Sequence, residues 1–200
     1  MNVYETVISR RSIRRFKDTP VPRELLERCV NAARLAPSAG NLQPLEYIII
    51  DDEKLLPGVF STIKWAAYIK PRGEPPPVQR PAAYITVLRK KDIGIPDTVH
   101  YGIGMAAQNI MIVALAEGVG SCAFGGVNQV KLRPILNVPA DYEIPLVLAL
   151  GYPDEAPIEE PFDGSVKYWR DENDVHHVPK KRLEAVRHWN MFQAVYHPAS

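Results

Sequence analysis

The sequence has few cysteines and no recognisable set of metal ligands. Its two cysteines, Cys29 and Cys122, do not form a C-x-x-C pair, and the five histidines are not spaced with them as zinc ligands are. Neither a disulfide framework nor a metal site is therefore predicted. Cys122 also has no evident histidine partner, which argues against a thiol nucleophile.

Charge of one sign is lacking as well. The 24 basic and 23 acidic residues leave a formal net charge of +1, so no global field draws the chain to nucleic acid or to an anionic membrane. No run of about 18 uncharged apolar residues occurs, and the N-terminus shows no basic segment followed by an apolar one. We expect a cytoplasmic protein without a membrane or nucleic-acid partner.

Two common nucleotide-binding patterns are missing, namely G-x-G-x-x-G after a strand and G-x-x-x-x-G-K-[ST]. Neither a Rossmann dinucleotide site nor a P-loop is therefore predicted. The 200 residues are 46% hydrophobic, which is enough to bury the core of one domain. Any anion that the chain binds must meet a local cluster of residues.

Hydrophobic periodicity predicts helices and strands that do not alternate strictly. The first expected helix covers residues 2–10. The second starts at Pro22 and is ended by Pro37, and its inward face is expected to carry Leu25, Leu26, Cys29, Val30 and Ala33. Two more are expected over residues 53–68 and from a cap at Asp97 or Thr98 to Gly118. The expected strands cover residues 46–50, 83–88, 119–124 and 144–150. This order favours an α+β or mixed three-layer fold over a doubly wound one.

Three further segments have a distinctive composition. The helix that ends at Gly118 is apolar nearly all round, so it belongs in the centre of the protein or in a dimer interface. Residues 71–81 are dense in proline and are expected to form a surface loop. The C-terminal tail keeps large apolar residues, including Trp169, Leu183, Trp189 and Phe192, and must pack on something.

The most informative local pattern is R-R-S-I-R-R-F over residues 10–16. Guanidinium groups bind phosphate bidentately and keep their charge, so two or three of them suit an anion site. The alternative is a solvated basic face or a nucleic-acid patch. The near-zero net charge and the lack of interleaved aromatic residues argue against nucleic acid.

Two loops offer further candidate contacts. Residues 36–44, A-P-S-A-G-N-L-Q-P, carry amide side chains that match the polar edge of a heteroaromatic ring. Residues 118–126, G-V-G-S-C-A-F-G-G, end a predicted strand in two glycines, where backbone N–H groups can approach a flat ligand. Ordinary turns are the alternative for both segments.

Taken together, these patterns resemble the nitroreductase family. The motifs occur in order along essentially the whole chain: R-R-S-x-R-x-F at 10–16, A-P-S-A-G-N-x-Q-P at 36–44, A-A-Q-N-I at 106–110, G-V-G-S-C at 118–122 and A-L-G-Y-P at 149–153. The resemblance implies an α+β fold with a mixed sheet flanked by helices in three layers. It also implies one domain over residues 1–200, an intertwined homodimer, and a C-terminal extension at 160–200 that packs on the partner subunit.

The resemblance assigns FMN sites to the subunit interface, with four groups of contacts. The phosphate and ribityl chain are expected to be bound by Arg10, Arg11, Ser12 and Arg14. A later basic pair that completes the phosphate site is expected at Lys180 and Arg182. The loop that reaches the flavin of the other subunit is expected to contribute Pro37, Ser38, Asn41 and Gln43. The backbone that faces the flavin ring is expected at Gly125 and Gly126.

The implied activity is hydride transfer from NADH or NADPH through FMN to a small-molecule oxidant, such as a nitroarene, quinone or activated alkene, by a ping-pong mechanism. The flavin supplies this chemistry, so no catalytic side chain is assigned. The alternatives are a reductive dehalogenase, a flavin-destroying enzyme of cobalamin-ligand synthesis, and a flavin-binding sensor or storage protein without turnover. Leu45 stands where the family often has Trp, and this departure bears on the substrate more than on the cofactor.

Overall fold

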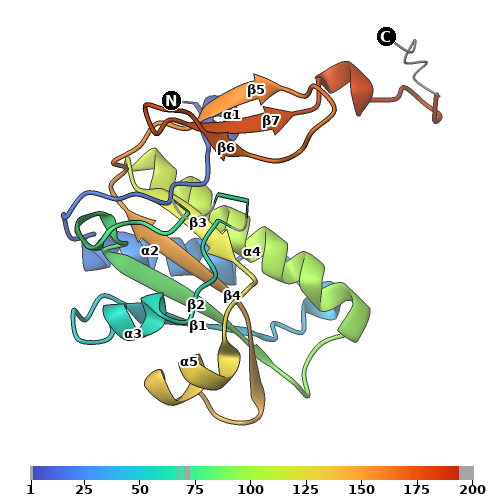
Figure 1. Ribbon diagram of the computed structural model, residues 1–200. Helices are drawn as coiled ribbons and strands as arrows, with labels where there is room; N and C mark the ends of the chain where they lie inside the picture. Colours follow the sequence, from blue (N-terminus) through green and yellow to red (C-terminus); the bar gives the residue numbers. More distant parts are fainter. Residues whose placement is uncertain (1, 67, 70–72, 194–200) are drawn as a thin grey trace.

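A four-stranded sheet forms the centre of the computed structural model, which describes residues 2–66, 68–69 and 73–193. Its strands lie in the order β1 (Leu45–Ile50), β2 (Ala83–Lys90), β4 (Tyr142–Gly151), β3 (Gly120–Phe124), as Figure 1 shows. All three neighbouring pairs are antiparallel. The two middle strands are apolar on both faces because helices cover the sheet from both sides.

The two faces of the sheet have separate hydrophobic cores. On one face lie α2 (Arg23–Arg34) and α4 (Pro96–Ala116), and on the other lie α3 (Leu56–Phe60) and α5 (Gln129–Ile135). Adjacent residues of β2 illustrate the division, since Ile85 packs in the first core and Tyr84 in the second. The three-layer α+β architecture predicted from the sequence is thereby confirmed.

Most of the predicted elements are present. The predicted inward face of α2 is buried at Leu25, Leu26, Cys29 and Ala33, whereas Val30 is only partly buried. The strand predictions agree with the structure to within a few residues at each end. α1 (Val3–Ser9) begins with a capping box, in which the side chain of Asn2 accepts from the backbone of Glu5 and the side chain of Glu5 accepts from the backbone of Asn2.

Two helix predictions were wrong. The helix expected over 53–68 covers only Leu56–Phe60, because the chain then turns to pair with the segment after β3 through an Ile63–Val127 bridge. α4 begins at Pro96 with Ile95 as its cap, not Asp97 or Thr98, since proline is suited to the first turn. The sequence analysis also missed α5, which Asn128 caps by accepting from the backbone N–H of Lys131.

α4 presents one face to the sheet and the other to solvent. Ala106, Ile110 and Ala114 are fully buried against the sheet, while Tyr101 and Met105 are 70% and 39% exposed. By length and composition alone, α4 also meets the criterion for a membrane-spanning helix, a criterion that core helices of water-soluble proteins meet as well. An exposed apolar face on a core helix is a feature of protein interfaces.

A second, smaller sheet follows the core. It contains β5 (Ile158–Pro161), β7 (His176–Lys180) and β6 (Trp169–Arg170), with β5 parallel and β6 antiparallel to β7. Figure 1 shows this small sheet at the top of the molecule, with the N-terminal segment beside it. The small sheet therefore mixes parallel and antiparallel pairs, whereas the central sheet is antiparallel throughout its three pairs.

The chain then continues into η3 (Leu183–Ala185) and away from the core. Trp189 and Phe192 are 67% and 80% exposed. The tail expected to pack thus does not bury these side chains within one chain. That residues 160–200 pack on a partner subunit stays a prediction, and residues 194–200 lie outside the described residues.

Candidate functional site

The arginine-rich segment is held in an extended conformation beside β3. The backbone N–H of Ile13 donates to the carbonyl of Ser121 at 2.9 Å, and that of Lys17 donates to Tyr152 at 2.8 Å. Ile13 and Phe16 are 6% and 0% exposed, so they anchor the segment in the core. The arginines between them are left at the surface of the core, next to the small sheet.

This close approach requires glycine at the start of β3. A Cβ at Gly120 would lie 2.6 Å from Cγ1 of Ile13, which is inside van der Waals contact. The A-L-G-Y-P motif has a second such position, because a Cβ at Gly151 would lie 2.8 Å from the ring of Phe16. The two glycines therefore set the position of the arginine segment relative to the sheet.

The four arginines differ in their partners. Arg11 forms an ion pair with Glu159 at 2.6 Å, and Arg15 forms one with Asp174. Among the described residues, no carboxylate pairs with the guanidinium of Arg10 or Arg14. Two permanently charged groups are thus left for an external anion.

The surroundings of Arg10 and Arg14 resemble those of a binding site. The Nε of Arg14 is buried and has no hydrogen-bond partner within the described part of the chain. Its Nη1 lies 3.5 Å from the carbonyl of Ser12 and 3.3 Å from Nδ1 of His176. Burial, and then the charge of Arg11, lower the pKa of Arg10. An anion beside these two groups would neutralise their charge and accept a hydrogen bond from the Nε of Arg14.

A cavity of about 200 Å³ lies next to this segment. It is lined by residues 9–11, Ile13, Leu115, 119–121, Pro153 and 155–157. Glu155 is among them, but its carboxylate already accepts from Arg170 and from two backbone N–H groups. Pockets that enclose a whole small molecule usually measure about 300–1,000 Å³, so this cavity suits part of a cofactor.

The amide-bearing loop has unusual backbone geometry. Gly40, Asn41 and Gln43 have φ values of 59°, 54° and 49°, a region that non-glycine residues rarely adopt. Oγ of Ser38 accepts from the backbone N–H of Gln43 at 3.0 Å and stabilises the turn. The side chains of Asn41 and Gln43 are exposed. Strain of this kind occurs often at ligand sites.

The structure does not bring this loop to the arginine segment of the same chain. The loop packs beside Gly102 in the first half of α4, whereas Arg10 packs near Leu115 at its other end. These two positions on α4 are about 20 Å apart at 1.5 Å of rise per residue. Each chain thus carries two separated parts of a site.

Gly125 and Gly126 lie in the turn after β3 and are exposed. Among the residues that the structure describes, a Cβ at Gly125 would meet only the carbonyl of Pro145, at 4.0 Å, and one at Gly126 would meet only Lys64, at 3.8 Å. The carbonyl of Gly126 accepts from the backbone N–H of Lys64 at 3.1 Å. The protein's own packing therefore leaves space over this turn that a flat ligand can fill.

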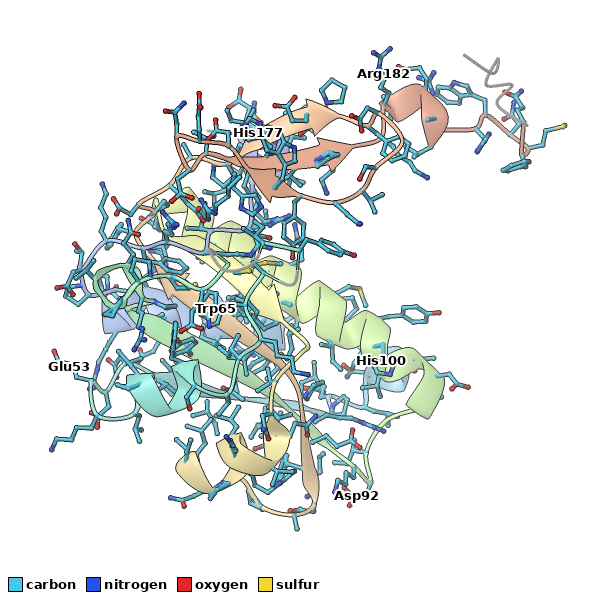
Figure 2. All side chains as sticks on the ribbon, in the orientation of Figure 1. Glu53, Trp65, Asp92, His100, His177 and Arg182 are labelled. Carbon is cyan, nitrogen blue, oxygen red and sulfur yellow. The ribbon has the colours of Figure 1, made fainter. Side chains whose placement is uncertain are left out.

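Lys180 and Arg182 form a further group of predicted site residues, at the end of the small sheet. Lys180 ends β7 and Arg182 precedes η3, and both are exposed. Figure 2 shows Arg182 beyond the end of the small sheet. Among the described residues, no hydrogen bond or ion pair joins either of them to the arginine segment.

Two residues that contact this segment were not predicted from the sequence. Glu155 binds the backbone N–H of Arg14, which is 141 positions away, and His176 contacts the side chain of Arg14 from 162 positions away. No sequence pattern marks either residue, because their proximity to Arg14 arises only when the small sheet folds over the segment. Cys122 is 3% exposed, and burial raises the pKa of its thiol, which argues against nucleophilic chemistry.

Comparison with known proteins gives the family. The family model described as the Nitroreductase family matches residues 7–152. A Methanothermobacter thermautotrophicus protein provisionally named NADH dehydrogenase/NAD(P)H nitroreductase is 29% identical over 163 residues, which cover 78% of this chain and 80% of that protein. The chain belongs to the nitroreductase family, because the matched residues span more than half of it.

Two further relatives bear on the activity. The structure of a provisionally named nitroreductase from Desulfovibrio desulfuricans, solved in complex with FMN, is 25% identical with a TM-score of 0.64 and covers 78% of this chain and 88% of its own. A 5,6-dimethylbenzimidazole synthase from Rhodospirillum rubrum is 26% identical over 178 residues, covering 76% of this chain and 82% of that protein.

Proposed function

We propose that the chain is an FMN-dependent oxidoreductase that uses NADH or NADPH and acts as a homodimer with both flavin sites at the interface. The observation that carries this proposal is the pair of guanidinium groups, Arg10 and Arg14, that no described carboxylate neutralises. They stand in a segment that the core fixes in place. The FMN named for the Desulfovibrio structure and the NAD(P)H named for the Methanothermobacter protein support it.

The residues present fit an FMN phosphate. Arg10, Ser12 and Arg14 would bind it, and the buried Nε of Arg14 is an unused donor of the required kind. Gly125 and Gly126 would leave space for one face of the ring. Arg11 is expected to act less directly, since Glu159 already pairs with it.

Bound FMN would supply the hydride-transfer chemistry between the nicotinamide and a nitroarene, quinone or activated alkene. The protein's part is to bind the cofactor, to orient it and to leave one face open to both substrates in turn. A ping-pong mechanism follows, because two flat substrates cannot occupy the same face together. No side-chain acid or base is required for this sequence of events.

The dimer is proposed from the separation of the two half-sites. Because the loop carrying Pro37, Ser38, Asn41 and Gln43 lies about 20 Å along α4 from the arginine segment, we assign it to the flavin of the partner subunit. The exposed face of α4 and the exposed tail offer the apolar surface that such an interface needs. In this dimer, Lys180 and Arg182 would complete the phosphate site. The cytoplasmic location stays a prediction.

A second candidate is consumption of the flavin itself, and the Rhodospirillum relative favours it. The two functions differ in what happens to the flavin. An oxidoreductase returns its FMN intact after many turnovers, whereas a 5,6-dimethylbenzimidazole synthase loses flavin absorbance in proportion to product.

The deciding experiment uses the purified protein loaded with FMN. We expect flavin absorbance that NAD(P)H bleaches anaerobically, multiple turnovers with a quinone, and parallel double-reciprocal lines at several quinone concentrations. A colourless protein that fails to bind added FMN would contradict the proposal. A flavin that is reduced only once and never reoxidised by any oxidant would instead indicate a sensor or storage protein.

A further inference from the structure

Two adjacent histidines in β7 point to opposite faces of the small sheet. His177 lies on the outer face (Figure 2). Its ring stacks on that of Trp169 with the ring centres 4.1 Å apart, and its Nδ1 is hydrogen-bonded to Oε1 of Glu160 at 2.7 Å. His176 lies on the inner face and is 1% exposed, with Nδ1 3.3 Å from Nη1 of Arg14. The alternation of side chains along a strand gives the two histidines separate environments.

The contact with Arg14 fixes the tautomer of His176. A guanidinium has only donors, so Nδ1 must accept and the ring proton must be on Nε2. Nε2 is buried, and no group among the described residues accepts a hydrogen bond from it. A buried donor without an acceptor is unfavourable, so it calls for a partner such as a water, an ion or a ligand.

The environment keeps this imidazole neutral. Burial first, and then the positive charges of Arg14 and Arg170, lower the pKa of His176 to about 3. A charged imidazolium would lose the acceptor on Nδ1 and would repel Arg14. The neutral ring can instead orient Arg14 and still offer one N–H group.

An aromatic cluster connects His176 with the rest of the candidate site. The guanidinium of Arg14 lies 5.0 Å from the centre of the Tyr168 ring, and the ring of His176 lies 5.3 Å from it. Tyr168 in turn contacts Tyr68 at 5.0 Å. Tyr68 is four positions beyond Lys64, whose backbone N–H donates to the carbonyl of Gly126. The cluster therefore joins Arg14 and His176 to the segment that contains Tyr68.

We propose that His176 is a positioning residue of the phosphate site, which holds Arg14 through Nδ1 and donates from Nε2 to a phosphate oxygen of FMN. The inference rests on the proposed function. It adds to the site a buried residue of the small sheet, which lies beyond the residues 7–152 that the family model matches.

The experiment measures binding of FMN and of riboflavin, which lacks the phosphate, to the apoprotein by quenching of flavin fluorescence. The variants are His176→Leu, which removes both nitrogens, and His176→Asn and His176→Gln, which each retain one polar position. His177→Leu is the matched control, because it changes the neighbouring residue on the other face. Circular dichroism and thermal unfolding confirm that each variant is folded.

We expect His176→Leu to raise the Kd for FMN by about tenfold or more, from the loss of a charge-assisted hydrogen bond and of Arg14 orientation. The Asn and Gln variants should show smaller increases, and His177→Leu should bind FMN as the parent does. The Kd for riboflavin should change less than twofold in all variants.

An FMN Kd within threefold of the parent in folded His176→Leu, His176→Asn and His176→Gln would overturn the inference. So would an equal loss of FMN and riboflavin affinity. If the parent binds neither flavin, the proposed function fails first, and this outcome is distinguishable from failure of the inference alone.

Discussion

The carboxylate of Glu155 and the guanidinium of Arg170 form a buried ion pair, with Oε2 and Nη2 2.5 Å apart and side chains that are 6% and 2% exposed. The other oxygen of Glu155 accepts from the backbone N–H groups of Arg14 and Arg15. One carboxylate thus joins the small sheet to the arginine segment. The geometry of the candidate phosphate site depends on this connection.

Glu155→Gln should destabilise the protein and weaken FMN binding together. Removing the charge of one partner of a buried ion pair costs about 3–5 kcal/mol when nothing else neutralises the other partner. The cost should be lower here, because Arg170 also pairs with Asp174 at 3.8 Å. The matched control is Glu159→Gln, since the side chain of Glu159 is 52% exposed and its pair with Arg11 should contribute about 1 kcal/mol or less. Urea unfolding measures the loss of stability in both variants, and quenching of flavin fluorescence measures FMN binding. Equal, small losses in the two variants would contradict the role given to Glu155.

Substitution by alanine should change the stability of the protein at Gly120 but not at Gly125. Gly120→Ala overpacks Ile13 and should lower the free energy of unfolding by about 1–3 kcal/mol, because the contact of 2.6 Å must be relieved. Gly125→Ala meets no protein atom closer than 4.0 Å and should leave the unfolding of the apoprotein unchanged. It should nevertheless weaken FMN binding if the ring packs there. Unchanged affinity would remove Gly125 from the site.

The sequence predicted much of the framework because local rules decide it. Apolar runs defined the strands, and the spacing of Leu25, Cys29 and Ala33 defined the buried face of α2. The errors lie where tertiary contacts override local preference. The predicted helix at 53–68 stops at Phe60 because the following residues pair with the segment after β3.

The candidate site was only partly predictable, for a similar reason. The motif at 10–16 identified the arginines, but not that Arg11 and Arg15 are neutralised by Glu159 and Asp174. Those acids lie in the small sheet, far along the chain, and no local pattern reports which arginine they will contact. The separation between Gln43 and the arginine segment is likewise a property of how α4 is packed.

The two histidines of β7 should make the free energy of unfolding depend on pH in opposite directions. His176 should make the protein less stable as the pH falls. Its folded pKa of about 3 lies below the ordinary value of 6.5, so only the unfolded chain gains the proton as the pH falls between these values. The parent should therefore lose up to about 2 kcal/mol between pH 7.5 and pH 5 through this group. Denaturant unfolding of His176→Asn should show a smaller loss over the same interval. An unchanged loss would show that His176 is not buried as a neutral ring.

His177 should act with the opposite sign. The hydrogen bond to Glu160, followed by that to Asp171, raises its pKa above 6.5. The resulting stabilisation is fully present below pH 6.5 and is lost as the pH rises through the folded pKa. His177→Gln should thus destabilise the protein more at pH 5.5 than at pH 8.5, by a small amount because the site is near solvent. A greater destabilisation at pH 8.5 would contradict this assignment.

The shared site makes a prediction that depends on the dimer itself. One parent chain carries Arg10→Ala and Arg14→Ala, and the other carries Asn41→Ala and Gln43→Ala. If the 37–44 loop serves the flavin of the partner, a heterodimer of these chains contains one site with all its residues intact and one site with both defects. Mixing the two nearly inactive homodimers should restore up to half of the parental activity per heterodimer.

Subunit exchange must be shown separately, by a tag on one chain and mass spectrometry of the captured dimers. The control mixes chains in which all four substitutions are on one chain and none on the other, which gives two half-damaged sites in every heterodimer. Arg28→Ala serves as a surface arginine control, because its pair with Glu117 is exposed. If exchange occurs and the activity of the mixed variants stays at that of the homodimers, the loop and the arginines do not meet at one flavin. The 20 Å separation along α4 would then need another explanation, and a monomer in light scattering would exclude the shared site directly.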